Sequence, residues 1–221
     1  MNVTAALEAR RSVRAYSDRE LPEAVIRDIL DVARHAPSGA NMQPWEVAVV
    51  TGGAKQRLDA ALERAFREGA ATDAAFDYYP KVWREPFKTR RKACGLQMYR
   101  ALEITREDTV RQQAQWAANF RAFDAPAVLF FFMDGSFSEG GLIDMGIFLQ
   151  SVMLAATEHG VGSCAQAALA EYSGVVREVL GISGEKRLVA GMAMGYADEA
   201  APVNGYRTDR EAAEDFTLFF R

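Results

Sequence analysis

The sequence has little cysteine, little histidine and no excess of positive charge. Its 221 residues include two cysteines, Cys94 and Cys164, and two histidines, so neither a disulfide framework nor a zinc site is indicated. Asp and Glu (30) outnumber Lys and Arg (26), and the net charge is −4. Proteins that bind nucleic acid normally carry a basic surface. We therefore expect no bound metal and no nucleic-acid partner.

The patterns of exported and membrane proteins are also missing. The first eight residues contain neither the basic region nor the apolar region of a signal peptide. No window approaches the apolar length of a transmembrane helix. We expect a soluble, cytoplasmic protein with no membrane partner.

No set of catalytic side chains stands out. Residues 160–165 fit the pattern G-x-G-x-x-A, but they follow a long expected helix late in the chain, whereas a dinucleotide fingerprint follows a strand and opens a helix. There is no phosphate-binding G-x-x-x-x-G-K-[ST] motif, and His35 and His159 lack partner motifs. We expect no catalytic side chain. If the protein is an enzyme, a cofactor supplies the chemistry.

What the sequence does contain is enough apolar residues, 49%, for one full core. Hydrophobic spacing predicts helices and strands in alternation along the chain. We expect helices over 3–10, from 21 to before 37, after Thr51-Gly52-Gly53, and over 88–103, 107–123, 142–159 and 173–180. We expect strands over 46–50, 127–133, 160–166 and 188–196. The run 127–133 is apolar throughout, which is typical of a strand covered on both faces.

Two apolar segments favour contact with a second chain. The helix 142–159 is apolar around most of its circumference, so it should be buried on nearly all sides, and a second subunit could share it. The tail 198–221 ends in the apolar run 216–220. We expect this run to dock as a strand on a sheet, either its own or a partner's.

Residues 73–92 combine five aromatic residues with two prolines. This composition is too aromatic for a disordered linker and too interrupted for a regular element. It indicates either an ordered lid whose rings lie against something flat or a satellite hydrophobic cluster under a long loop.

Three arginines and a serine stand together at Arg10, Arg11, Ser12 and Arg14. Like charges this close repel one another unless an anion lies between them. Arginine suits a phosphate because its planar group donates two parallel hydrogen bonds, and a serine hydroxyl can add another. The alternative is a solvated helix end that contributes only to solubility.

Taken together, several motifs of the chain resemble the FMN-dependent nitroreductase family. The motifs are residues 10–14 (RRSVR), 37–45 (PSGANMQPW), 162–166 (GSCAQ), 191–196 (GMAMGY) and 206–210 (YRTDR). The resemblance runs from about residue 5 to the C-terminus. It implies an α+β flavoprotein homodimer with FMN at the subunit interface and a long central helix in that interface. It also implies one domain over residues 1–221, with residues 70–123 as an inserted helical and aromatic excursion covering the flavin and 198–221 as an arm that reaches the partner.

The resemblance assigns cofactor-binding residues by position. Arg10, Arg11 and Ser12 would lie near the FMN phosphate or ribityl chain, and Arg14 near the pyrimidine edge of the flavin as electrostatic support. The remaining assigned positions are Pro37, Ser38, Asn41 and Gln43 along the ring from the other subunit, Cys164, Ala165 and Gln166 at its edge, and Arg207 or Arg210, with Arg210 favoured, at the phosphate. Many relatives carry proline where this chain has Ala165.

The excursion resembles the nitrobenzoate and nitroaromatic reductase branch of the family. The resemblance implies substrate contacts from Tyr78, Trp83, Phe87, Arg90 and Phe120. The activity implied is reduction of nitroaromatic or quinone-like acceptors by NAD(P)H, with ping-pong hydride transfer through the flavin N5. The alternatives are reductive dehalogenation, flavin fragmentation, and a non-catalytic flavin-binding dimer.

Overall fold

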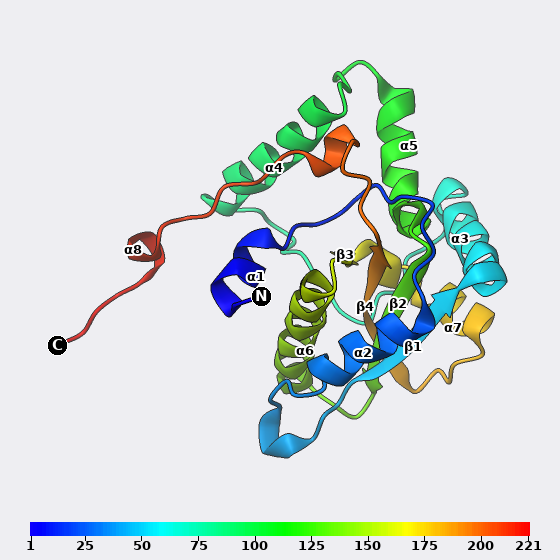
Figure 1. The fold of residues 1–221 in the computed structure, drawn as a ribbon. Helices are drawn as coiled ribbons and strands as arrows, with labels where there is room; N and C mark the ends of the chain where they lie inside the picture. Colours follow the sequence, from blue (N-terminus) through cyan, green and yellow to red (C-terminus); the bar gives the residue numbers. More distant parts are fainter.

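A four-stranded antiparallel sheet lies at the centre of the fold (Figure 1). The computed structural model describes residues 1–221. The strands are β1 (Glu46–Thr51), β2 (Ala127–Asp134), β3 (Gly162–Gln166) and β4 (Lys186–Gly195), and their order across the sheet is β1-β2-β4-β3. Strands β1 and β3 are therefore the two edges. The predicted strands are confirmed, with shifts of one or two residues at their ends.

Helices pack against both faces of this sheet. In chain order the helices of the protein are α1 (Val3–Ala9), α2 (Glu23–Ala33), α3 (Gly52–Arg67), α4 (Phe87–Ala101), α5 (Thr109–Phe120), α6 (Glu139–Glu158), α7 (Ser173–Leu180) and α8 (Ala213–Phe216). Those that cover the sheet are α2 and α6 on one face and α3, α5 and α7 on the other. Short 3-10 turns are η1 (Gly39–Asn41), η2 (Ala122–Asp124), η3 (Ala168–Ala170) and η4 (Pro202–Asn204). The mixture of helices and an antiparallel sheet gives the predicted α+β class.

Strand β2 divides the core into two clusters. Successive side chains of a strand point to opposite faces, so Leu129 and Phe131 pack with α2 and α6, while Phe130 and Phe132 pack with α3, α5 and α7. Residues 127–133 are all buried, as the apolar run predicted. The sheet is thus covered on both faces within one chain.

The long helix α6 is less buried than its sequence predicts. Met145, Phe148 and Val152 lie in the core, but the side chains of Ile143 and Ile147 are 68% and 38% exposed. One apolar strip of α6 therefore faces outward. By length and composition alone α6 could cross a membrane, so the prediction that no segment approaches this apolar length was wrong for α6.

The structure differs from two further predictions, on the end of α5 and on the C-terminal tail. The helix expected to reach residue 123 ends at Phe120, because Ala122, Phe123 and Asp124 adopt positive φ angles. The tail forms the short helix α8 and no strand, and residues 216–220 extend away from the sheet (Figure 1) with four exposed apolar side chains. Docking of the tail on its own sheet is therefore not what the chain does.

Candidate functional site

The arginine cluster lines a cavity of about 640 Å³ between the N-terminal segment, α4 and the start of the tail. Five arginines line it: Arg10, Arg11, Arg14, Arg207 and Arg210. The other lining residues are Leu7, Glu8, Ser12, Cys94, Gln150, Val203, Tyr206 and Thr208. The fold thus brings together arginines almost two hundred positions apart, against one lining carboxylate.

The N-terminal segment is fixed along the free edge of β3. The backbone N–H of Val13 donates to the carbonyl of Ser163 (3.0 Å), and Ser12 forms an isolated parallel bridge with Ser163. The approach needs a glycine, because a Cβ at Gly162 would lie 2.7 Å from a methyl group of Val13. Residues 10–14 therefore lie along the β3 edge of the sheet, with the side chains of Arg10, Arg11, Ser12 and Arg14 lining the cavity.

Asn204 in η4 joins the two ends of the chain. Its Oδ1 accepts from the backbone N–H of Arg14 (2.8 Å), and its Nδ2 donates to the carbonyl of Ala15 (2.8 Å). The guanidinium of Arg14 donates to the Tyr206 hydroxyl (3.2 Å). The sequence reasoning missed Asn204 and Tyr206, and nothing in the sequence indicates that they contact a residue some 190 positions earlier.

The two late arginines are held differently. Arg207 donates to the carbonyls of Ala9 (3.0 Å) and Arg10 (3.1 Å), where helix α1 ends and its last carbonyls lack helical partners. Arg210 donates only to its own loop, to the carbonyls of Thr208 and Asp209 and to the Thr208 hydroxyl. Arg207 is thus committed to the backbone of the arginine segment, and Arg210 is not.

The cavity carries an excess of positive charge. Burial, followed by the neighbouring charges of Arg210 and Arg207, lowers the pKa of Arg10. Arg11 forms an ion pair with the exposed Glu199, while its Nε is buried without a hydrogen-bond partner. A crowded set of guanidinium groups with a spare buried donor suits a multiply charged anion such as a phosphate ester.

Strand β3 runs beside the arginine segment, and of its residues 164–166 only Ala165 has an exposed side chain. Cys164 is buried, its side chain lies in the core cluster under α3, and burial raises the pKa of its thiol. Gln166 is buried too: its amide donates to the carbonyl of Asn119 (3.0 Å), and its Oε1 has no partner. Ala165, between them, is exposed. Cys164 is therefore a neutral thiol and no nucleophile.

The loop that contains Pro37, Ser38, Asn41 and Gln43 lies elsewhere. Its Gly39 N–H donates to both carboxylate oxygens of Asp144 (3.2 and 3.3 Å), near the N-terminal end of α6. The N-terminal amino group beside α1 pairs instead with Glu158, at the other end of α6 (Figure 1). Fourteen residues of helix separate these anchors by about 21 Å. Gln150, the α6 residue that lines the arginine cavity, lies six residues, or about 9 Å, beyond Asp144. None of the four predicted loop residues lines that cavity.

The loop itself is tightly constrained. Ala40, Asn41 and Gln43 all have positive φ angles, between 48° and 56°. The Ser38 hydroxyl accepts from the Gln43 N–H (2.9 Å), and the Gln43 side chain donates to the Asn41 carbonyl (3.0 Å). These local bonds hold a backbone conformation that non-glycine residues rarely adopt.

The predicted substrate residues do not share one site. Tyr78 lines a second cavity of about 350 Å³, whereas Trp83 and Phe87 line neither this cavity nor the arginine cavity. Arg90 forms an ion pair with Glu211 of the tail (2.9 Å). Phe120 is 4% exposed and stacks on Phe66 in the core. The prediction that Phe120 contacts substrate is therefore wrong: its ring points into the core and not into a cavity.

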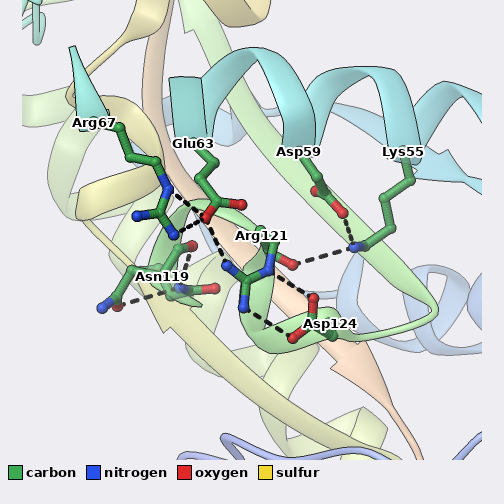
Figure 2. Close-up of polar contacts among 8 residues, drawn as sticks. Lys55, Asp59, Glu63, Arg67, Asn119, Arg121 and Asp124 are labelled. Atoms are coloured by element: carbon green, nitrogen blue, oxygen red, sulfur yellow. Dashed lines mark hydrogen bonds and ion pairs between the residues drawn. The ribbon is translucent and has the colours of Figure 1, made fainter. Parts of the chain in front are cut away.

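A charge network between α3 and the turn that follows α5 is a further feature that the sequence shows only in part. Lys55 donates to Asp59 (2.5 Å) and to the carbonyl of Arg121 (3.2 Å), and Arg121 pairs with Asp124 (2.9 Å) and Glu63 (3.0 Å), as Figure 2 shows. Burial raises the pKa of Asp59 to about 6 despite the lowering effect of Lys55. The spacing of Lys55 and Asp59 is readable from the sequence, but the links to Arg121 need the fold. The network holds the turn of positive-φ residues that follows α5.

With this geometry in view, the chain can be compared with known proteins. The profile of the Nitroreductase family matches residues 7–196. The chain belongs to the nitroreductase family. This confirms the resemblance drawn from the motifs. Family members with similar sequences include Nitroreductase NfnB of Mycolicibacterium smegmatis, 39% identical over 97% of this chain and 91% of that protein. A second is the 4-nitrobenzoate reductase of Pseudomonas putida, 34% identical over 97% of this chain and 94% of that protein.

Solved structures of nitroreductases show the same fold. The FMN-dependent nitroreductase NfnB from Mycobacterium smegmatis, crystallised in complex with NADPH, superposes with a TM-score of 0.93 at 38% identity. The match covers 99% of this chain and 97% of that one. The nitroreductase fold predicted for the chain is thus confirmed.

Proposed function

We propose that this chain is an FMN-dependent NAD(P)H oxidoreductase that reduces nitroaromatic or quinone-like acceptors. The observation that carries the proposal is the cavity lined by five arginines, in a chain of the nitroreductase family. Relatives with similar sequences are named for the reduction of nitroaromatic compounds.

The residues of the cavity fit the phosphate end of FMN. Arg10, Arg11 and Ser12 would hold the phosphate and ribityl chain, and the unpaired Nε of Arg11 offers a donor without breaking an existing bond. Arg210, which bonds only within its own loop, is the better candidate for a distal phosphate contact. Arg207 would act indirectly, by fixing the backbone of Arg10.

When bound, FMN supplies hydride transfer, taking electrons from NAD(P)H and passing them to the acceptor in two separate half-reactions. The protein positions the groups and sets the charge around them. The positive charge of Arg14, held by Tyr206 and Asn204, would stabilise negative charge that develops at the pyrimidine edge. Ala165 would lie against the ring through its backbone, and the neutral thiol of Cys164 would take no part in the chemistry.

The complete site is a product of two chains. Pro37, Ser38, Asn41 and Gln43 line no part of the arginine cavity of their own chain, so we infer that this loop completes the site of a partner. The exposed strip of α6 at Ile143 and Ile147 supplies an apolar surface for that association. The tail, residues 198–221, would then reach the partner with its exposed apolar run 216–220. We propose a cytoplasmic homodimer of one-domain chains in which the excursion, residues 70–123, covers the flavin.

The visible absorption spectrum of the purified protein tests this function. We expect a yellow flavin spectrum that bleaches under anaerobic conditions when NADPH and then NADH are added. A nitroaromatic or quinone acceptor should restore it, and a halophenol should not. Bound flavin that neither donor reduces would favour the non-catalytic dimer. A colourless protein that takes up no added FMN would contradict the proposal.

A further inference from the structure

The second cavity, of about 350 Å³, has a distinct chemistry. Nine of its twelve lining residues are hydrophobic, and they include Phe76, Tyr78 and Tyr79 from the excursion and Leu188 and Val189 from β4. The volume is within the range of small-ligand sites, which are typically apolar with a few polar groups. An apolar cavity with three aromatic walls suits one substituted benzene ring.

The only charged side chains that line this cavity are carboxylates. Its lining contains the carboxylates of Asp77 and Glu171 and no lysine, arginine or histidine. Asp77 is exposed and lies 3.6 Å from Lys81, whereas Glu171 is half-buried with no ion-pair or side-chain hydrogen-bond partner. Burial raises the pKa of Glu171, because a carboxylate charge is less well solvated there than in water. A second carboxylate beside it would meet an uncompensated charge.

The cavity wall is fixed and adjoins the proposed flavin site. The backbone N–H of Asp73 donates to the carbonyl of Glu171 (2.9 Å), and the Asp73 carboxylate accepts from the N–H of Gly174 (2.8 Å), so the excursion is tied to η3 and α7. Ala167, which lines the cavity, follows β3 directly. It lies four residues, or about 13 Å of extended strand, beyond the contact of Ser163 with the arginine segment. The cavity thus lies at the end of β3 away from the phosphate site, where the ring of an extended cofactor would reach.

We propose that this cavity receives the aromatic ring of the acceptor and that Glu171 makes the enzyme select neutral nitroaromatics over nitrobenzoates. The inference rests on the proposed function and specifies its substrate class. It separates this chain from the 4-nitrobenzoate reductases among its relatives. The arginine that could have attracted a benzoate, Arg90, is paired with Glu211 and does not line the cavity.

The test compares two substrates that share a ring and a nitro group and differ in charge, 4-nitrobenzoate and 4-nitrobenzamide. The kcat/KM for each is measured with the FMN-loaded protein, with Glu171→Gln, and with Glu178→Gln, which removes an exposed carboxylate of α7. We expect the unmodified enzyme to favour the amide by about ten-fold or more, because like charges brought together at low solvation repel strongly. Glu171→Gln should remove most of this preference, and Glu178→Gln should keep it.

A second measurement needs no variant. Benzamide should inhibit the unmodified enzyme at lower concentration than benzoate, in competition with the acceptor. Equal use of both substrates, a preference for nitrobenzoate, or a preference that Glu171→Gln leaves intact would overturn the inference while leaving the proposed function standing. A flavin that NAD(P)H does not bleach would overturn both, and the spectrum shows this before any acceptor is added.

Discussion

At the scale of single residues, Arg11 is the most informative position of the arginine cavity. Its one ion pair is with an exposed glutamate, and such pairs contribute at most about 1 kcal/mol to stability. A charge-assisted contact with a phosphate is stronger, at about 1.5–3 kcal/mol. Arg11→Ala should therefore weaken FMN binding by roughly ten- to a hundred-fold while the protein stays folded.

Equilibrium dialysis against free FMN measures this change. Arg27→Ala is a matched control, because Arg27 is an exposed arginine on α2 whose ion-pair partner is Glu23, four residues earlier. An Arg11→Ala protein that purifies with a full complement of FMN would remove the phosphate role from Arg11.

Asp59 should leave a signature in the pH dependence of stability. Its folded pKa, about 6, is above the usual 3.8, so the folded protein binds this proton more tightly than the unfolded chain does. The group therefore adds stability at low pH that is lost as the pH rises through about 6. Between pH 4 and pH 7 the free energy of unfolding of the natural protein should fall by about 2 kcal/mol relative to Asp59→Asn.

Urea unfolding of the natural protein and of Asp59→Asn at each pH gives the difference between their free energies of unfolding. The prediction concerns how this difference changes with pH. A constant offset from the lost bond to Lys55 cancels. Asp28→Asn, an exposed substitution on α2, is the matched control for the loss of one carboxylate. A flat difference would show that folding leaves the pKa of Asp59 unchanged, and a stability of the natural protein that grows with pH relative to Asp59→Asn would show that folding lowers this pKa.

At the scale of elements, the contact between the arginine segment and β3 depends on Gly162. A methyl group there would lie 2.7 Å from a Val13 methyl, so the segment has to move away from the strand. Gly162→Ala should cost about 1–3 kcal/mol of stability, as overpacking does, and weaken FMN binding because Arg10 to Arg14 lose their anchor. Thermal unfolding with and without added FMN measures both effects.

Gly184→Ala is the comparison, since a Cβ at Gly184 meets no atom within 4 Å. Its stability and FMN affinity should match those of the natural protein. If Gly162→Ala behaved in the same way, the segment would not need its close approach to β3.

Elements with a strong local pattern could be predicted from the sequence, and those decided by tertiary contacts could not. The run 127–133 is apolar at every position, which requires cover on both faces, and all seven residues are buried in β2. The end of α5 at Phe120 carries no proline or glycine signal: it depends on positive φ angles at Ala122 to Asp124 that the Arg121 network holds. Likewise, an aromatic side chain at Phe120 is compatible with core burial and with the substrate contact that the resemblance implies, and only packing against Phe66 decides between them.

The candidate site divides in the same way. Arg10, Arg11, Ser12 and Arg14 could be found because their charges crowd together in five residues. Asn204 lies outside every motif, and the motif 206–210 gives Tyr206 no role, because the role of both residues comes from contacts across the whole chain. Charged residues that are close in sequence can be recognised from the sequence, but the distant residues that bind and position them become known only from the folded structure.

At the scale of the whole molecule, the separation of the loop from the arginine cavity leads to a prediction about assembly. If the two parts of the FMN site come from different chains, a monomer should lose the cofactor even with every site residue intact. Ile143 and Ile147 lie on the exposed strip of α6. The double substitution Ile143→Lys and Ile147→Lys places charge on this strip, where burial in a dimer would be costly. We expect a monomeric protein with little bound FMN, measured by light scattering and absorbance on the same gel-filtration peak.

Val32→Lys, at an exposed apolar position on α2, is the control and should remain dimeric and yellow. A double variant that is monomeric and still retains FMN would show that one chain holds the whole site. A double variant that stays dimeric would place the interface on another face.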